Sequence, residues 1–238
     1  QQIKNFLKVY YGYDLSWGQI KEISNQTEGW MAAVNLVGKN LRQGLEREVV
    51  MTEETVKLLF DYLEQEVFIS LSERVREFLL KTSILEEMEV EICNQLLSIN
   101  HSQEILRQLK THNLFIEQID SKQFRYHKLF QQFLQKKAKQ NYELEDLYSK
   151  AKKIYFKQGQ IEEVINYSLQ LSETEEILGL IIKKAEEWLE NKRYDLLGRC
   201  LTSIPEDYFS TYPVLYIYQG AHYFCLQNYE LEIGRAHV

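Results

Sequence analysis

The chain has 238 residues, of which 45% are hydrophobic and 13% aromatic, and it contains only two prolines. This length and composition are enough to bury a sizeable core and to form two or three small domains. The formal net charge of −7 argues against a protein whose whole surface binds nucleic acid or an anionic membrane, and no apolar run approaches the roughly 18 residues of a membrane span. Because the first residues lack the apolar core of a signal peptide, we expect a cytoplasmic protein.

Glycine and proline are scarce, and apolar residues recur with a helical period over most of the length, which indicates a mainly α fold. One helix is predicted from about Ser16 to Gln26. A second is predicted from about Glu28 to Gly44, where the charged stretch QGLEREVVMTEE ends the apolar pattern. We interpret residues 1–46 as one helical module.

Residues 52–140 are predicted to form a winged helix. After a weak cap at Thr52, the apolar stripe of VKLLFDYLEQEVFISL indicates one helix, and Ser72 is the expected N-cap of the next. VEICNQLL and SQEILRQLKTHN indicate two shorter helices. LFIEQID and FRYH then alternate as the strands of a β-hairpin before the helix KLFQQFLQKKAKQ. Helices followed by a two-stranded ribbon are typical of the winged-helix variant of the helix-turn-helix.

Residues 141–232 contain an internal repeat. Its copies begin at Ala151, Ala185 and Ala221, which are 34 and 36 residues apart. Each copy has an apolar or aromatic residue three positions later and then a predicted turn before a second helix. The period is close to the roughly 34 residues of a tetratricopeptide unit, so we predict stacked, tetratricopeptide-like helical pairs. The consensus glycine is present at Gly159, but Arg193 and Tyr229 replace it in the later copies.

The ends of the chain suggest a piece of a longer protein. The sequence does not start with methionine, and the apolar periodicity stops before the last six residues, IGRAHV. These residues, 233–238, are what a common sequencing adapter gives when translated. We therefore expect a non-native tail on an internal fragment.

The sequence contains no recognisable catalytic motif. It lacks a phosphate loop of the form G-x-x-x-x-G-K-[ST], a G-x-S-x-G elbow and an H-E-x-x-H helix, and its carboxylates are spread along solvated helix faces. Cys93, Cys200 and Cys225 are far apart in apolar helical contexts, which we interpret as buried thiols. We expect no catalytic residue and no metal site in this segment.

The winged-helix pattern makes direct DNA binding one candidate function. The recognition helix would be SQEILRQLKTHN, with Arg107, Lys110, His112 and Asn113 as possible contacts. Its charge is low, because Glu104 offsets one of only two cations. A further set of basic residues is more typical of a solvated helix face: Lys136, Lys137, Lys139, Lys150, Lys152 and Lys153. Direct DNA binding and a nucleotide-free protein-interaction scaffold both stay open as alternatives to the regulatory function inferred below.

His127 stands where FRYH passes into the following helix. A lone histidine next to Tyr126 and Phe130 is more often a packed or surface side chain than a ligand-binding group. The residues alone leave both interpretations open.

Residues 15–170 resemble the middle of the large ATP-dependent LuxR-type transcriptional regulators, the MalT-like branch of the signal-transducing (STAND) ATPases. The likeness rests, in order and with matching intervals, on TEGWMAAVNLV, FDYLEQEVFISLSERVREFLLKTSILEEMEVEICNQLL and LRQLKTHNLFIEQIDSKQFRYHKLFQQFL. In that family a nucleotide-binding domain with a phosphate loop precedes a helical domain, a winged helix, a tetratricopeptide-like sensor and a C-terminal DNA-binding helix-turn-helix. The resemblance implies that this chain begins after the phosphate loop and stops inside the sensor.

The resemblance also implies nucleotide-binding roles for three residues. His127 matches the winged-helix histidine that contacts the β-phosphate of ADP in the family. EGWM matches the family's Gly-Trp-Pro turn near the adenine, so Trp30 is assigned to that turn and Met31 stands where the family has proline. Methionine can supply apolar contact but lacks the fixed φ of proline. The alternative for Trp30 is an ordinary core indole.

The implied cofactor of the intact protein is ATP or ADP, held with an upstream nucleotide-binding domain, and none is expected in this fragment alone. The intact protein would at most be a slow regulatory ATPase. A small-molecule or protein inducer would bind the repeats, for which Tyr155, Tyr167, Tyr216 and Tyr223 are candidates, although aromatics at helical spacing mostly form the core between helices. DNA would be bound by a missing C-terminal domain, with self-association on activation and no membrane partner.

Overall fold

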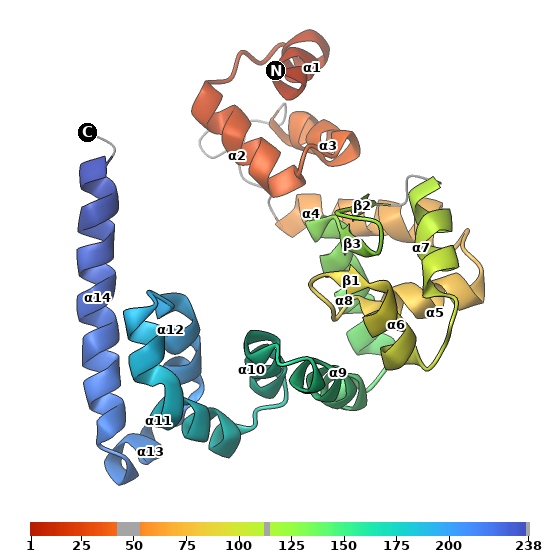
Figure 1. The fold of residues 1–238 in the computed structure, drawn as a ribbon. Helices are drawn as coiled ribbons and strands as arrows, with labels where there is room; N and C mark the ends of the chain where they lie inside the picture. The colour runs from red at the N-terminus through yellow and green to blue at the C-terminus, as the bar shows by residue number, and fades with distance from the viewer. Residues whose placement is uncertain (42–52, 112–114, 237–238) are drawn as a thin grey trace. The chain divides into compact units, whose positions relative to one another are not determined.

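The computed structural model describes residues 1–41, 53–111 and 115–236 and is mainly α with one small sheet, which confirms the predicted fold class (Figure 1). The chain divides into two compact units, Gln1–Leu144 and Glu145–Val238. The elements of the first unit are α1 (Gln2–Tyr11), α2 (Trp17–Thr27), α3 (Met31–Leu41), α4 (Glu53–Tyr62), the π-helical turn η1 (Leu63–Phe68), α5 (Glu73–Thr82), β1 (Met88–Glu89), α6 (Val90–Leu97), α7 (Ser102–Thr111), β2 (Ile116–Gln118), β3 (Gln123–Tyr126) and α8 (Lys128–Asn141).

The helical segment, residues 1–41, contains α1, α2 and α3. Ser16 caps α2 in a capping box with Gln19, so the helix lies close to the predicted range of Ser16 to Gln26. The next helix begins at Met31 and not near Glu28, because Glu28 (φ 48°) and Gly29 (φ 75°) both take the left-handed conformation that ends α2. The packed interior of this segment is aliphatic: Ile3, Leu7, Ile20, Ile23, Val34 and Val37.

The winged-helix segment, residues 53–141, departs from the prediction in two places. The helix predicted after Thr52, which itself lies outside the described residues, ends in the π-helical turn η1. The sheet has a third strand, β1, and the order β1-β3-β2. Met88 of β1 lies opposite Phe124 of β3. A strand of two residues is too short to show an alternating pattern, which is why the sequence did not indicate it.

The core of the winged-helix segment is aromatic. Phe130 of α8 is fully buried, with ring centroids 5.2 Å from Phe115, 5.9 Å from Tyr126 and 6.1 Å from Phe133. The buried hydroxyl of Tyr126 lies 2.7 Å from Thr82 Oγ1 of α5. Burying a side chain as large as Phe130 contributes about 1.5–3 kcal/mol to folding. Helix α8 is therefore fixed to both the sheet and α5.

The second unit consists of helical pairs. Its elements are α9 (Glu145–Lys157), α10 (Ile161–Gln170), α11 (Thr174–Glu190), α12 (Tyr194–Ser203), α13 (Glu206–Thr211) and α14 (Val214–Ala236). The left-handed residue between α9 and α10 is Gly159 (φ 71°), whereas between α11 and α12 it is Lys192 (φ 57°). Arg193 itself has φ −84°, so the consensus glycine position needs no glycine in the second copy.

The predicted turn of the third copy is wrong. Helix α14 runs without a break from Val214 to Ala236, through Tyr229, where the turn was expected. No glycine or proline lies between Ala221 and Glu232 to end it. Among the described residues, none of the helices combines the length and the apolar character needed to cross a membrane.

Candidate functional site at the start of helix α8

His127 joins β3 to α8 and is the N-cap residue of that helix. Its backbone N–H donates to the carbonyl oxygen of Phe115, 2.9 Å away, so its position is set by the segment that leads into β2. The His127 side chain is 36% exposed. The strand and the helix thus hold the backbone of His127 firmly while its ring remains accessible.

Glu28, in the turn between α2 and α3, reaches this helix start. Its Oε2 accepts a 2.7 Å hydrogen bond from the backbone N–H of Lys128 and lies 3.3 Å from His127 Nδ1. The first N–H groups of a helix lack partners within the helix and carry the positive end of its dipole, so a carboxylate is favourable there. Sequence reasoning missed Glu28, and the only local signal was an acidic residue directly before the Gly-Trp of the motif.

Trp30 meets the winged-helix segment beside the same point. Its ring centroid lies 4.6 Å from that of Phe115, at an interplanar angle of 65°. Because Phe115 also accepts the hydrogen bond from His127 N–H, one residue connects two of the predicted site residues. Met31, the third, begins α3 and is 39% exposed, on the helical-segment side of the junction.

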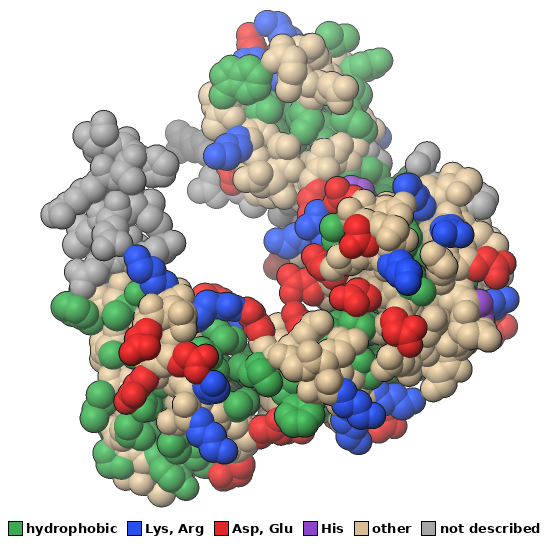
Figure 2. Space-filling view, in the orientation of Figure 1, with side chains coloured by type: hydrophobic (Ala, Val, Ile, Leu, Met, Phe, Trp, Pro, Cys, Tyr) green, Lys and Arg blue, Asp and Glu red, His purple; other side chains and the backbone are tan. Residues whose placement is uncertain are grey.

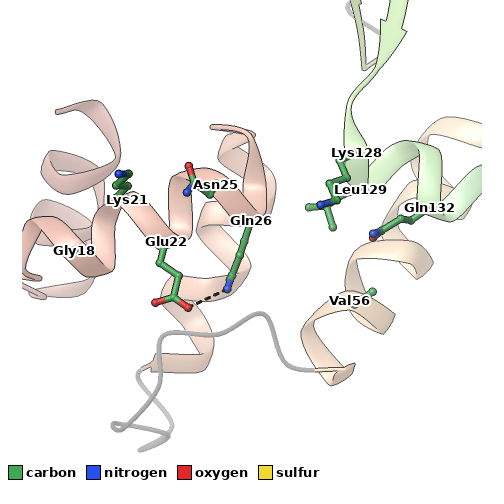
Figure 3. A pocket seen from close by; sticks show the side chains of 9 residues that line it. All are labelled: Gly18, Lys21, Glu22, Asn25, Gln26, Val56, Lys128, Leu129 and Gln132. Atoms are coloured by element: carbon green, nitrogen blue, oxygen red, sulfur yellow. Dashed lines mark hydrogen bonds between the residues drawn. The ribbon is translucent and has the colours of Figure 1, made fainter. Parts of the chain in front are cut away.

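A polar cleft of about 590 Å³ adjoins this junction, between α2, α4 and α8 (Figure 3). Lys128 and Gln132 extend from α8 on one side, and α2 forms the other side, where Glu22 accepts a 3.4 Å bond from Gln26. The residues that line the cleft are Gly18, Lys21, Glu22, Asn25, Gln26, Val56, Lys128, Leu129 and Gln132. Its size is in the range of small-molecule sites, and most of the residues that line it are polar. Two lysines against one glutamate favour an anionic occupant.

Arg125 adds a further charge to the strand that leads to His127. Its guanidinium donates a 2.7 Å hydrogen bond to Glu117 of β2. The hydrogen bond with Glu117 raises the pKa of Arg125, and the carboxylates of Glu28 and Glu87 act in the same direction. Arg125 is therefore a permanent positive charge with acidic side chains close to it.

Of the residues proposed for direct DNA contact, the structure describes Arg107 and Lys110, which are both exposed on α7. On α7, Lys110 Nζ donates a 2.6 Å bond to Gln118 of β2, and Arg107 lies on an exposed face, while His112 and Asn113 lie outside the described residues. On the visible face of the first unit, acidic side chains are interspersed with basic ones (Figure 2). Several lysines of the basic run have partners: Lys137 pairs with Glu64, Lys152 with Glu173 and Glu176, and Lys136 lies over the ring of Phe60.

The four candidate tyrosines of the second unit divide into two kinds. Tyr155 and Tyr167 are buried and stack with ring centroids 5.7 Å apart, so they belong to the core between α9 and α10. Tyr216 and Tyr223 on α14 are exposed. Hydrophobic side chains also gather on the visible face of this unit (Figure 2).

The cysteines are free thiols of two kinds. Cys93 and Cys200 are buried as predicted, whereas Cys225 is only partly buried. Burial raises the pKa of Cys200 to about 11, which disfavours the reactive thiolate. Within the described part of the chain, no group of three or more His, Cys, Asp or Glu side chains could hold a metal ion.

Comparison with known proteins agrees with the resemblance inferred from the sequence. Residues 64–146 match the family described as the MalT winged helix domain. The chain is 25% identical over 222 residues to the HTH-type transcriptional regulator MalT of Yersinia pestis (strain Pestoides F), covering 90% of this chain and 24% of the relative. For the regulator of the same name from Yersinia enterocolitica, identity is 25% over 228 residues, covering 92% and 25%. The chain thus spans about a quarter of the length of these relatives.

The family match covers the segment from η1 to the start of α9, including β1, the hairpin and the whole of α8. The predicted winged helix is thereby confirmed, and the similarity to the curated regulators extends beyond it on both sides. The chain is therefore similar to the MalT regulators over most of its length, and its residues 64–146 match the MalT winged helix domain.

Proposed function

We propose that this chain is part of an ATP-dependent, inducer-responsive transcriptional regulator. In it the winged helix stabilises the ADP-bound resting state, and the helical pairs of the second unit bind an inducer or partner. The similarity to transcriptional regulators supports the general class. The observation that carries the finer proposal is that Trp30 and His127, distant in sequence, both meet Phe115 at one junction.

The residues at the junction suit a phosphate on one side of the His127 ring. Glu28 occupies the Nδ1 side, where a second anion would be repelled, whereas Nε2 has no hydrogen-bond partner among the described residues. Lys21 and Lys128 add positive charge in the adjoining cleft. ADP would bring the phosphate groups, held with an upstream domain that carries the phosphate loop. Because Nδ1–H is directed at Glu28, His127 would bind a phosphate oxygen through Nε2 when that nitrogen carries the ring's second proton.

A comparison of binding energies shows that His127 alone cannot shift the protein between its closed and open states. A hydrogen bond between an imidazole N–H and a phosphate oxygen contributes on the order of 1.5–3 kcal/mol. Changing a population from nearly all closed to nearly all open needs about 5.5 kcal/mol of differential binding. The rest must come from the contact of the helical segment with the winged helix and from the inducer.

The test compares His127→Ala with His101→Ala in the full-length protein. His101 is another histidine of the winged-helix segment, where it accepts a 3.1 Å bond from Arg74 and lies away from the junction. We expect His127→Ala to weaken ADP binding by about tenfold or more and to raise transcription without inducer, because one charge-assisted bond is lost. His101→Ala should change neither. Unchanged ADP affinity together with unchanged basal transcription in His127→Ala would contradict the proposal.

The remaining parts of the proposal concern partners outside this chain. DNA is bound by a C-terminal domain, the activated protein self-associates, and the protein acts in the cytoplasm. Binding of the 238-residue chain to duplex DNA with a steep salt dependence would instead support direct recognition by the winged helix, because phosphate contacts dominate such affinity.

A further inference from the structure

The Glu28 carboxylate is held in place by two groups of the α8 start. The shorter bond, 2.7 Å from Lys128 N–H to Oε2, joins it to the backbone, which cannot rotate away as a side chain can. The same oxygen lies 3.3 Å from His127 Nδ1. The left-handed backbone of Glu28 (φ 48°) is uncommon for a residue with a side chain, so the turn that presents the carboxylate is a defined one.

This arrangement makes the two nitrogens of the His127 ring unequal. A carboxylate can only accept hydrogen bonds, so the contact between Glu28 Oε2 and His127 Nδ1 requires the hydrogen to be on Nδ1. In a neutral ring the other nitrogen, Nε2, then carries the lone pair. The hydrogen bond made by Nδ1 thus decides which of the two nitrogens is protonated. Nε2 has no hydrogen-bond partner in the described part of the chain, and the side chain is 36% exposed.

We propose that Glu28 is a positioning residue for His127: it holds the ring through Nδ1 and leaves Nε2 as the nitrogen that meets a ligand. The role toward a phosphate-bearing ligand rests on the proposed function, whereas the positioning does not. The arrangement also couples the turn between α2 and α3 to the ring. Any motion that withdraws Glu28 from α8 releases His127.

The test is nuclear magnetic resonance of the 238-residue chain labelled with 15N-histidine, at alkaline pH and without nucleotide. The 15N shifts distinguish a protonated from an unprotonated ring nitrogen, and loss of one signal set in His127→Gln assigns the ring. In the unsubstituted chain we expect Nδ1 of His127 to carry the hydrogen. In Glu28→Ala the ring should shift toward the Nε2–H form that histidine prefers in water. Glu28→Gln, which keeps an accepting oxygen, should restore the Nδ1–H form at least in part.

Glu22→Ala is the matched control, because it removes a carboxylate from α2 that is bonded to Gln26 of its own helix. It should leave the His127 shifts unchanged. An Nε2–H ring in the unsubstituted chain, or unchanged shifts in a folded Glu28→Ala, would overturn the proposal. The first of these outcomes does not depend on whether Glu28→Ala folds. Since nucleotide is absent, the result is independent of the ADP test, which can fail while the positioning holds.

Discussion

The polar contacts inside the first unit join residues farther apart along the chain than those inside the second unit. In the first unit, polar contacts join residues far apart: Glu28 binds the backbone of Lys128, and Thr82 binds Tyr126. Both contacts end on α8 or on the strand that leads into it. Helix α8 is therefore the element on which the helical segment, α5 and the sheet converge.

In the second unit the polar contacts join each helix to the next but one along the chain. Lys152 of α9 pairs with Glu173 and Glu176 at the start of α11. Further contacts link α10 to α12 and α11 to α13: Glu162 with Arg193, Asn166 with Arg199, and Glu175 with Tyr208. Stability in such an arrangement is approximately a sum of local terms, whereas a unit organised on one element should respond as a whole. The following substitutions test this difference.

The largest effect is expected from Phe130→Ala, which removes the centre of the aromatic core of α8. Truncating a fully buried phenylalanine costs about 3–5 kcal/mol, from lost burial and the cavity left behind. Hydrogen exchange measured by mass spectrometry should show lost protection throughout the first unit, including α2 and α3, with the second unit unchanged. Phe156→Ala, at an exposed phenylalanine of α9, is the control and should cost little. Loss confined to α8 would contradict convergence on that helix.

A smaller effect is expected from Lys152→Met in the second unit. The Lys152 ammonium lies 2.9 Å from Glu176 and also pairs with Glu173. Burial is the largest single influence on Glu173 and would raise its pKa, but the hydrogen bond and the positive charge of Lys152, together with smaller contributions from neighbouring side chains, outweigh it and leave that pKa below its usual value. We expect a loss of about 0.5–1 kcal/mol at neutral pH, measured by urea unfolding.

The sign of the pH dependence follows from the lowered pKa. The unfolded chain takes up a proton on Glu173 at a higher pH than the folded one, so the stabilisation is complete above the unfolded pKa and disappears as the pH falls through the folded pKa. The difference between the unsubstituted chain and Lys152→Met should therefore shrink in acid. Lys184→Met is the control, because its partner Glu187 lies on the same helix and both are exposed. An equal loss of unfolding free energy in the two variants would show that an ion pair between two helices stabilises the unit no more than one within a single helix.

The local features of the fold could be predicted from the sequence. The Ser72 cap, the helix VEICNQLL and the hairpin strands depend on residues a few positions apart, and the structure has all of them. The strand β1 could not be predicted, since its two residues become a strand only by pairing with β3. Similarly, a repeat pattern suggested a turn near Tyr229, but nothing in that stretch ends a helix and α14 continues.

In the candidate site, too, the motifs could be recognised from the sequence but the long-range contact could not. Trp30, Met31 and His127 were identified only through the resemblance to a family, and their nucleotide-binding roles stay predictions. Glu28 could not have been paired with His127, because the two are 99 positions apart and neither helical nor strand periodicity relates them. Sequence reasoning thus found the motifs on both sides of the junction but not the contact between them.

The most direct test of this contact is a double-mutant cycle of Glu28→Ala and His127→Ala in the 238-residue chain. The free energy of unfolding of the first unit is measured for the unsubstituted chain, both single variants and the double variant. Lys128 N–H stays available to Glu28 in His127→Ala, so the cycle isolates the contact with the ring. Because both side chains are partly exposed, we predict a coupling of about 0.5–1 kcal/mol. Effects that add to within about 0.3 kcal/mol would contradict an energetic link between the helical segment and the winged helix at His127.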